Sequence, residues 1–173
     1  MTSILKVDTI QTTAGAAPTA KDLGLNVTGN ILNHSYTQYS SAATITLNTG
    51  NYVDSTLSLT VTPQSTSSKF IITYNVYLYL PARVNGWSAA AGRILRDSTV
   101  IHTDAYALGR GAFYNSGAVY VHSMINSTDS YQDEPSTTSS ITYKLEVASY
   151  QGTTVYLHQA GQKGFLTVTE IEG

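Results

Sequence analysis

The chain has 173 residues, enough for one domain with a sizeable core, and charged residues make up only 12% of it, about half the usual share. The polar surface depends instead on 19 Ser and 25 Thr. A formal net charge of −2 excludes disorder driven by charge repulsion, and nine Lys and Arg against eleven Asp and Glu argue against nucleic-acid binding. Because the chain has no cysteine, disulfides and cysteine-based metal sites are excluded. No apolar run is long enough to cross a bilayer and no secretory leader is recognisable, so we expect no membrane insertion.

Residues 1–32 differ in character from the rest of the chain. A few apolar residues near the N-terminus could form one short strand, but the small, polar, Gly- and Pro-containing segment 11–20 follows them. Such a segment cannot build a core by itself. We therefore expect an extended arm that docks on a partner, by strand addition or in a groove. The apolar residues predicted to attach this arm are Ile4, Leu5, Val7 and Ile10.

Residues 33–173 carry one strand pattern after another. Apolar and polar residues alternate with the period of two that is typical of half-buried strands, turn-rich segments separate the runs, and no convincing amphipathic helix lies between them. The alternating runs are 57–62, 70–80 and 141–148, with shorter ones at 92–95, 100–102, 119–125, 154–157 and 165–171. The sequence predicts an all-β fold, with an antiparallel, jelly-roll-like β-sandwich head over residues 33–173 and an extended N-terminal arm over residues 1–32.

The histidines give no strong indication of a metal site. His34, His102, His122 and His158 lie in different predicted strands, and no two of them have the spacing that lets one element present two ligands. We therefore expect no metal and no cofactor. An alternative is that three copies of His122 or His158 stack about the axis of a trimer.

The densest acidic group is Asp129, Asp133 and Glu134, which we expect in a long, solvated Ser/Thr-rich loop. Paired carboxylates serve glycoside hydrolysis or calcium binding, but this group has neither the spacing of a calcium loop nor a second carboxylate group nearby in sequence. No Gly-x-Ser-x-Gly segment or phosphate-binding glycine pattern is present. The sequence therefore predicts no catalytic residue and a protein that is not an enzyme.

Arginine is distributed unevenly. All four arginines fall within 28 consecutive positions, in the same region as the only tryptophan. Trp, Tyr and Arg are the usual anchors of recognition surfaces, because they offer stacking area and forked hydrogen bonding. Loops are expected at 83–87, 110–114 and 126–135, where Trp87 and Tyr114 would stack on sugar rings and Arg83 or Arg110 would pair with anionic groups. Packing beneath loops or across a subunit contact is the alternative. The candidate ligand or interface residues are Arg83, Trp87, Arg110, Phe113 and Tyr114.

Self-association is expected from the low charge of the predicted sheets. The run 70–80 is apolar on one face, while its other face carries Tyr77 and Tyr79. Tyrosine is favoured in subunit interfaces, where charged residues are depleted. We expect a homotrimer with Tyr77 and Tyr79 as candidate interface residues.

Four segments resemble virion structural proteins of marine tailed bacteriophages. The opening 1–11, MTSILKVDTIQ, is similar to the N-terminal segment of that group, and 61–71, 93–101 and 166–171 look like parts of its fibre and spike tips. The resemblance implies a non-enzymatic virion component with an N-terminal attachment arm and a C-terminal jelly-roll head, commonly a homotrimer. It carries over no catalytic residue.

The expected function is therefore that of a short fibre or spike component on the surface of a bacteriophage particle, on its tail or capsid. The arm would attach to other virion proteins, and the head would adsorb to the host surface, where a glycan is a possible partner. One alternative is a capsid decoration or stabilising protein without receptor binding. Others are a glycan-cleaving tip that uses Asp129, Asp133 and Glu134, or a free lectin.

Overall fold

The computed structural model describes residues 23, 28–39, 43–46, 51–80, 86–113, 123–150, 154–158 and 162–173. The predicted arm residues Ile4, Leu5, Val7 and Ile10 lie outside the described residues. Among the described residues every regular element is a strand, and none forms a helix able to span a membrane. The strands are β1 (Ile31–Gln38), β2 (Ala43–Thr46), β3 (Val53–Val61), β4 (Lys69–Leu80), β5 (Gly86–Arg96), β6 (Thr99–Phe113), β7 (Ser123–Asp133), β8 (Ile141–Tyr150), β9 (Thr154–Leu157) and β10 (Phe165–Ile171).

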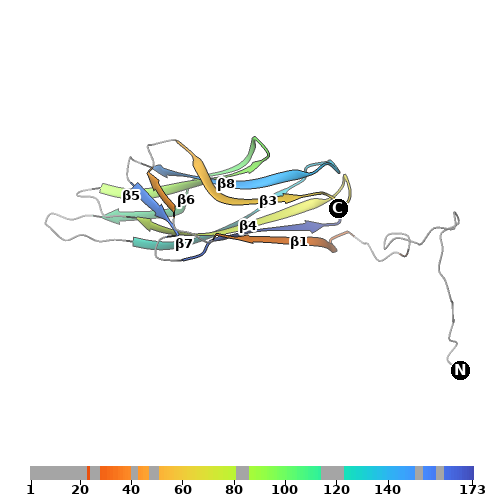
Figure 1. Cartoon of the computed structure of the whole chain (residues 1–173), viewed down its shortest axis with the longest axis horizontal. Coiled ribbons are helices and arrows are strands. Elements are labelled where there is room, and N and C mark those ends of the chain that lie inside the picture. The colour runs from red at the N-terminus through yellow and green to blue at the C-terminus, as the bar shows by residue number, and fades with distance from the viewer. Residues whose placement is uncertain are drawn as a thin grey trace, which may run out of the picture.

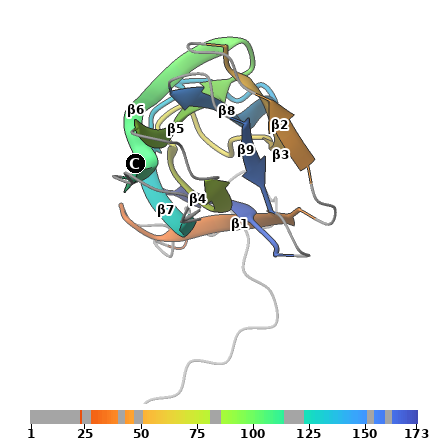
Figure 2. The ribbon, with the colours of Figure 1, turned by 90° about the vertical axis from the view of Figure 1, so that its left-hand side faces the viewer.

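The strands form two antiparallel sheets packed face to face (Figure 1). In the first sheet, β4 is central. It pairs with β7 along one edge and with β10 and β9 along the other, and β1 and β2 lie outside β10 and β9. The second sheet has the order β3-β8-β5-β6. The predicted antiparallel, jelly-roll-like β-sandwich is confirmed. Figure 2 shows that β6 of the second sheet comes next to β7 of the first along one side of the sandwich.

The core forms where the inward faces of the two sheets meet. Strand β4 contributes one complete alternating face, from Phe70 to Leu80, as its sequence pattern predicts. The second sheet supplies Leu57, Ile94, Tyr143 and Leu145, each at most 1% exposed. Burial of these apolar side chains is the main stabilising contribution in a chain without disulfides.

The strands run along the long axis and give the head two poles (Figure 1). The register pairs Lys69 of β4 with Ile171 of β10, and Ile171 with Ile31 of β1. We call this end the basal pole. The opposite end, where Leu80 of β4 pairs with Ser123 of β7 and β5 and β6 pair through Gly86 and Phe113, is the distal pole. At about 3.3 Å per residue, β4 alone separates the poles by roughly 36 Å.

Strand β1 begins at Ile31, two residues before the expected start of the head. At the basal pole the amide of Gly29 donates a hydrogen bond to the carbonyl of Glu172 at 2.8 Å, and the amide of Glu172 donates one to Asn30 at 2.9 Å. The chain therefore enters the head beside its C-terminal residues.

Strand β7 corrects the prediction of a loop at 126–135. Residues 123–133 pair with β4 along its whole length, from Leu80 opposite Ser123 to Phe70 opposite Asp133. The inward side of β7 is partly polar, so apolar alternation is weak there. Its carboxylates, Asp129 and Asp133, contact side chains of other strands as described below. The loops predicted at 83–87 and 110–114 are likewise corrected in part, because β5 begins at Gly86 and β6 continues to Phe113.

Candidate functional site

The group of side chains best suited to bind a ligand lies where β6 contacts β7. His102 and Asp104 are two positions apart on β6 and so share one face of the strand, and Asp129 on β7 approaches them from the other sheet. His102 Nε2 lies 3.2 Å from Asp104 Oδ2 and 3.5 Å from Asp129 Oδ2. We call these three residues the seam cluster, because they join the edges of the two sheets (Figure 2).

Each member of the seam cluster is held by a further contact. The buried Tyr74 donates its hydroxyl hydrogen bond to Asp104 Oδ2 at 3.0 Å. The backbone amide of Ser130 donates to Asp129 Oδ1 at 2.7 Å. The His102 ring stacks on Tyr131 with the ring centroids 4.6 Å apart. The three ligand atoms are therefore preorganised around one point.

The two carboxyls of the seam cluster have opposite pKa shifts. Burial, together with a contact to Asp129, raises the pKa of Asp104. Burial also acts to raise the pKa of Asp129, but the contacts with Asp104, the Ser130 amide and His102 outweigh it and lower that pKa. Burial, reinforced by Asp104, raises the pKa of Tyr74 beyond its usual range, so Tyr74 remains a hydrogen-bond donor. Two carboxyls this close need a proton or a cation between them.

Sequence reasoning missed the seam cluster. It compared histidines with one another, whereas the structure combines one histidine with two aspartates from two strands. The spacing His102-x-Asp104 was the available signal, since residues i and i+2 of a strand face the same way. The third ligand depends on sheet-to-sheet packing, which no local pattern specifies.

Three of the predicted recognition residues come together at the distal pole. In the register of β5 and β6, Trp87 lies opposite Ala112, Gly86 opposite Phe113 and Ala89 opposite Arg110. The backbones of Trp87, Arg110 and Phe113 therefore belong to the paired ends of two adjacent strands (Figure 1). Arg83 and Tyr114 lie outside the described residues.

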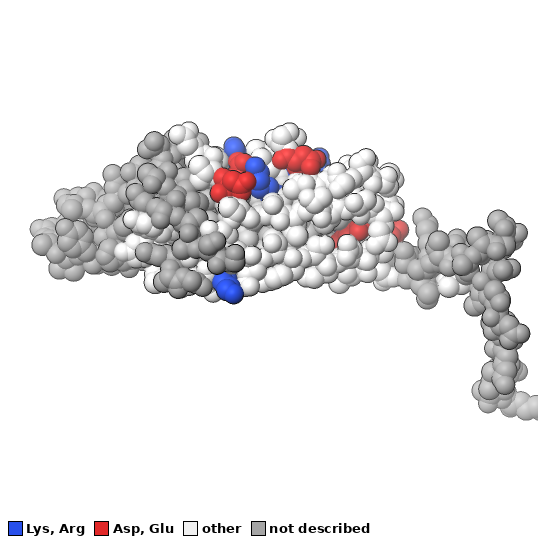
Figure 3. Space-filling view, viewed as in Figure 1, with Lys and Arg blue, Asp and Glu red and all other residues white. Residues whose placement is uncertain are grey.

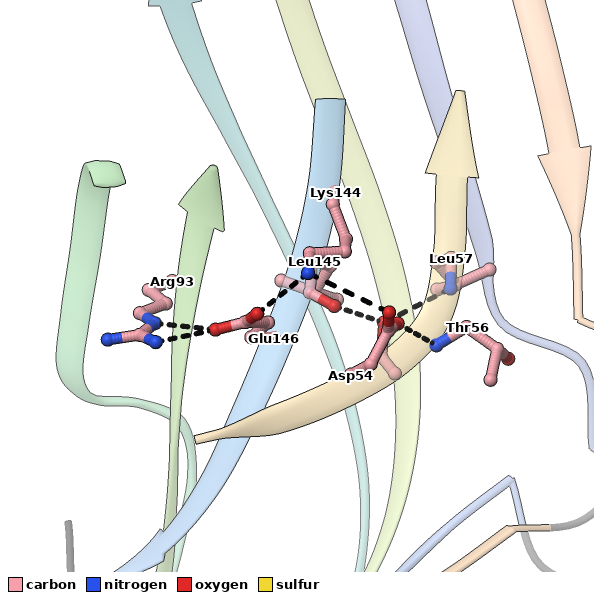
Figure 4. Close-up of polar contacts among 8 residues, drawn as sticks. Asp54, Thr56, Leu57, Arg93, Lys144, Leu145 and Glu146 are labelled. Atoms are coloured by element: carbon pink, nitrogen blue, oxygen red, sulfur yellow. Dashed lines mark hydrogen bonds and ion pairs between the residues drawn. The ribbon is translucent and has the colours of Figure 1, made fainter. Parts of the chain in front are cut away.

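The other two arginines, Arg93 and Arg96, form ion pairs within the head, Arg96 with Asp133 and Arg93 with Glu146. Arg93 contacts Glu146 through Nε at 2.8 Å and Nη2 at 2.6 Å, and it lies over the ring of Tyr52. Glu146 also pairs with Lys144 at 2.9 Å, and Lys144 lies 3.8 Å from Asp54 (Figure 4). In Figure 3, charged side chains gather over this outer face of the second sheet, while most of the remaining described surface in that view is uncharged.

The acidic group predicted from sequence is divided among three different contacts. Asp129 belongs to the seam cluster. Asp133 accepts hydrogen bonds from Arg96 at 2.9 and 3.0 Å and from Tyr143 at 2.8 Å. Glu134 pairs with Lys69 at 3.3 Å. Because Asp133 is paired with the Arg96 side chain and Glu134 with the Lys69 side chain, the two carboxylates do not form a free pair.

The outer face of the first sheet carries no Asp, Glu, Lys or Arg in the rows from His34 to Tyr79. In register, Tyr36, Thr167, Thr73 and Ser130 form one row across four strands. Thr73 and Ser130 share a hydrogen bond of 2.7 Å, and Tyr36 stacks on Phe165. This face, which we call the uncharged face, consists of His34, Tyr36 and Gln38 of β1, Phe165, Thr167 and Thr169 of β10, Ile71, Thr73, Asn75, Tyr77 and Tyr79 of β4, and Met124, Asn126, Thr128, Ser130 and Gln132 of β7.

The predicted interface residues Tyr77 and Tyr79 lie half-buried at the distal end of the uncharged face. The Tyr79 ring meets Tyr156 edge-on, with the centroids 5.5 Å apart. Met124, opposite Tyr79, is 57% exposed. Their role in a subunit interface stays a prediction.

His158 is fully buried within the subunit, which excludes its stacking about a trimer axis. Its Nδ1 accepts a long hydrogen bond of 3.5 Å from the Tyr77 amide, and its ring lies 4.8 Å from that of Tyr39. Burial lowers the pKa of His158 to about 4, so its imidazole is neutral at pH 7. His122, the other residue of that alternative, lies outside the described residues.

Comparisons with known proteins show only distant likenesses. No protein-family model and no curated sequence matches the chain. The infectious bursal disease virus VP2 subviral particle has a TM-score of 0.45 at 14% identity, over 83% of this chain and 34% of that chain. Dimeric latent PorU from Porphyromonas gingivalis has a TM-score of 0.39 at 10% identity, over 85% of this chain and 13% of that chain. The present chain thus spans about a third or less of each protein, and these scores are too low to carry a functional argument.

Proposed function

We propose that the chain is a non-enzymatic structural protein of a bacteriophage virion, in which residues 1–32 attach to the particle and the β-sandwich head is displayed. The observation that carries this proposal is that the head has two distinct ends, with the chain entering at one and the candidate recognition residues at the other. The chain enters at the basal pole, where Gly29 is hydrogen-bonded to Glu172. Trp87, Arg110 and Phe113 belong to the distal pole, at the far ends of the strands. A head tethered by its arm would thus direct these residues outward.

Two of the segments that carry the sequence resemblance are in contact within the head. Segment 61–71 comprises the end of β3, a turn and the start of β4, and 166–171 is most of β10. Glu170 joins them, since its carboxylate accepts hydrogen bonds from the Gln64 amide at 2.6 Å and the Ser68 hydroxyl at 2.7 Å. Segments 61–71 and 166–171, two of those similar to phage fibre and spike tips, therefore meet at the basal pole, where Gly29 is hydrogen-bonded to Glu172.

Adsorption to a host-surface glycan is the proposed role of the distal pole. Aromatic rings stack on sugar faces, and arginine binds anionic groups with two parallel hydrogen bonds. Trp87, Phe113 and Arg110 supply these groups on neighbouring strands, with Arg83 and Tyr114 close to them in sequence. The head would act as a short fibre or spike tip.

A homotrimer is the proposed assembly, with the uncharged face as the contact between copies. The face contains no Asp, Glu, Lys or Arg in the rows from His34 to Tyr79, and charged residues are depleted at interface cores. Tyr36 and Met124 are 53% and 57% exposed in the single chain. A trimer would bury them. Light scattering on the purified chain tests this, and a monomer at micromolar concentration would contradict it.

Capsid decoration without receptor binding is a second candidate function, favoured by the same uncharged face, which could equally contact other virion proteins. A glycan-cleaving tip gains less support, because Asp133 and Glu134 are occupied by Arg96 and Lys69. A free lectin differs from the main proposal in needing no attachment arm.

Assembly of particles with altered chains separates these possibilities. Deleting residues 1–30 should give a folded head that no longer incorporates, and replacing Ile4, Leu5, Val7 and Ile10 by serine should do the same at unchanged length. The matched control, Trp87→Ala with Arg110→Ala, should incorporate normally but adsorb less to host cells. Normal incorporation of both arm variants would refute attachment through the arm. Normal adsorption of the control would favour decoration.

A further inference from the structure

We propose that the seam cluster of His102, Asp104 and Asp129 is a binding site for a zinc-like divalent cation that fastens β6 to β7. The residue types are those that zinc selects, one imidazole nitrogen and two carboxylate oxygens. The proposal is independent of the virion role.

The distances between the candidate ligand atoms are close to those in a zinc site. In a tetrahedral zinc site with bonds of about 2.0–2.1 Å, ligand atoms lie about 3.3–3.5 Å from one another. The observed distances from His102 Nε2 to the two carboxylates are 3.2 and 3.5 Å, and all three ligand atoms lie within 4.8 Å of one another. Two of the three separations thus match a tetrahedral zinc site, and we expect the carboxylates of Asp104 and Asp129 to close on a bound ion.

The surroundings of His102 Nε2 also favour a bound cation. This nitrogen is buried from solvent and lies 3.2 and 3.5 Å from the two carboxylate oxygens, but neither contact has the geometry of a good hydrogen bond. A metal ion between the nitrogen and the carboxylates would satisfy all three groups. The His102 ring is at the same time fixed on Tyr131.

The surrounding contacts are those of a supported metal site. Tyr74 donates to one carboxylate ligand and the Ser130 amide to the other, and such outer hydrogen bonds orient ligands and strengthen binding. Calcium is a poor match, because it takes six to eight oxygen ligands and not imidazole. Three protein ligands would leave a fourth position for water.

A bound cation would link the two sheets at an edge. His102 and Asp104 lie on the last strand of the second sheet and Asp129 on β7 of the first. The ion would therefore act as a crosslink in a chain that has no cysteine.

Calorimetric titration of the full chain with zinc chloride, after removal of metal with EDTA, tests the proposal. We expect one zinc per chain and a higher melting temperature with zinc than with EDTA. His102→Gln, Asp104→Asn and Asp129→Asn should each weaken zinc binding by about tenfold or more. Asp104→Asn keeps an acceptor for Tyr74, and cooperative unfolding in EDTA shows that each variant is folded. The matched controls His34→Gln and Asp54→Asn, both outside the cluster, should bind zinc as the unchanged chain does.

Cobalt substitution gives a second readout. The visible absorption of low-coordinate Co²⁺ should appear with the unchanged chain and disappear with His102→Gln. The proposal is overturned if the unchanged chain binds no zinc, if the double variant His102→Gln/Asp129→Asn keeps full affinity, or if the controls lose affinity as much as the cluster variants. Displacement of zinc by equimolar calcium would also overturn it.

Discussion

Tyr143 of β8 donates a hydrogen bond of 2.8 Å to Asp133 of β7, so a fully buried phenol of one sheet is bound to a carboxylate of the other. Arg96 of β5 donates two more hydrogen bonds to the same carboxylate. Burial and Asp133 raise the pKa of Tyr143 beyond its usual range, which keeps the phenol a donor. Asp133 is therefore a point at which three strands from both sheets are joined.

Replacing Tyr143 by phenylalanine should lower the free energy of unfolding by about 1–2 kcal/mol, because the ring stays packed while the buried carboxylate loses one donor. Urea denaturation measures the difference. The control Thr99→Val removes a hydroxyl from an exposed side chain of β6, outside the uncharged face, and should change stability by less than about 0.5 kcal/mol. Equal losses in the two variants would contradict the importance of the link between the sheets.

Acid should destabilise the protein through His158. Its pKa is about 4 in the folded chain and about 6.5 when unfolded, so the unfolded state binds more protons between these values. Stability contributed by the neutral imidazole is complete above about pH 6.5 and is lost as the pH falls towards 4, by up to about 3 kcal/mol.

The variant His158→Phe should lack this component of the pH dependence. Subtracting its unfolding free energies from those of the unchanged chain, at several pH values in EDTA, isolates the contribution of His158. His34→Gln, at an exposed position, serves as the control. A flat difference curve for His158→Phe between pH 4 and 7 would show that His158 is not the group responsible.

Gly164 should tolerate no side chain. An added Cβ would lie 2.0 Å from Cε1 of His158 and 2.6 Å from the backbone oxygen of Asn75, which is fixed within β4. Gly164→Ala is expected to cost about 3 kcal/mol or more through overpacking. For comparison, a Cβ at Gly29 meets nothing within 4 Å, although its φ of +91° disfavours alanine by about 1–2 kcal/mol. Thermal unfolding should rank Gly164→Ala as the more damaging change, and the reverse order would contradict the packing described here.

Glu146, which is largely buried, should matter more for stability than exposed carboxylates. Burial acts to raise its pKa, but hydrogen bonds from Lys144 and Arg93 outweigh that effect and lower it. Glu146→Gln leaves two neighbouring cations without their shared partner and should cost about 2 kcal/mol near pH 7. The loss should shrink as the pH falls below about 4.5, because the carboxylate of the unfolded chain becomes protonated there, and it should disappear once the pH falls below the lowered pKa of the folded carboxylate. Glu134→Gln, in a more exposed pair with Lys69, should cost less than about 0.5 kcal/mol.

The sequence predicted those strands best in which one face is apolar throughout. The alternation from Phe70 to Leu80 and from Ile141 to Val147 corresponds to β4 and β8, whose inward residues form the core. Most of β7, from Asn126 onward, was missed because Asp129 and Asp133 occupy inward positions. His102 contacts Asp129 there, and Arg96 and Tyr143 donate hydrogen bonds to Asp133. That compensation depends on partners distant in sequence, so a local pattern cannot reveal it.

The same limit applies to the candidate site. His102 and Asp104 are close in sequence, but Asp129 and Tyr74 join them only because β6 and β7 meet at one side of the sandwich. The arginines show the opposite case: they are close together in sequence, which suggested that they form one recognition surface. The structure uses Arg93 and Arg96 for ion pairs near Glu146 and Asp133 instead.

The position of β1 determines how the head would carry mechanical load. If residues before Ile31 are held and the distal pole is pulled away, the force runs parallel to β1 and β10. The hydrogen bonds between these strands lie across that direction, from Ile31 opposite Ile171 to Gln38 opposite Phe165. They would bear the load together in shear, whereas pulling Ile31 and Ile171 apart at the basal pole would open them one after another. An anchored head would therefore resist a force along its long axis better than a force that pulls Ile31 and Ile171 apart at the basal pole.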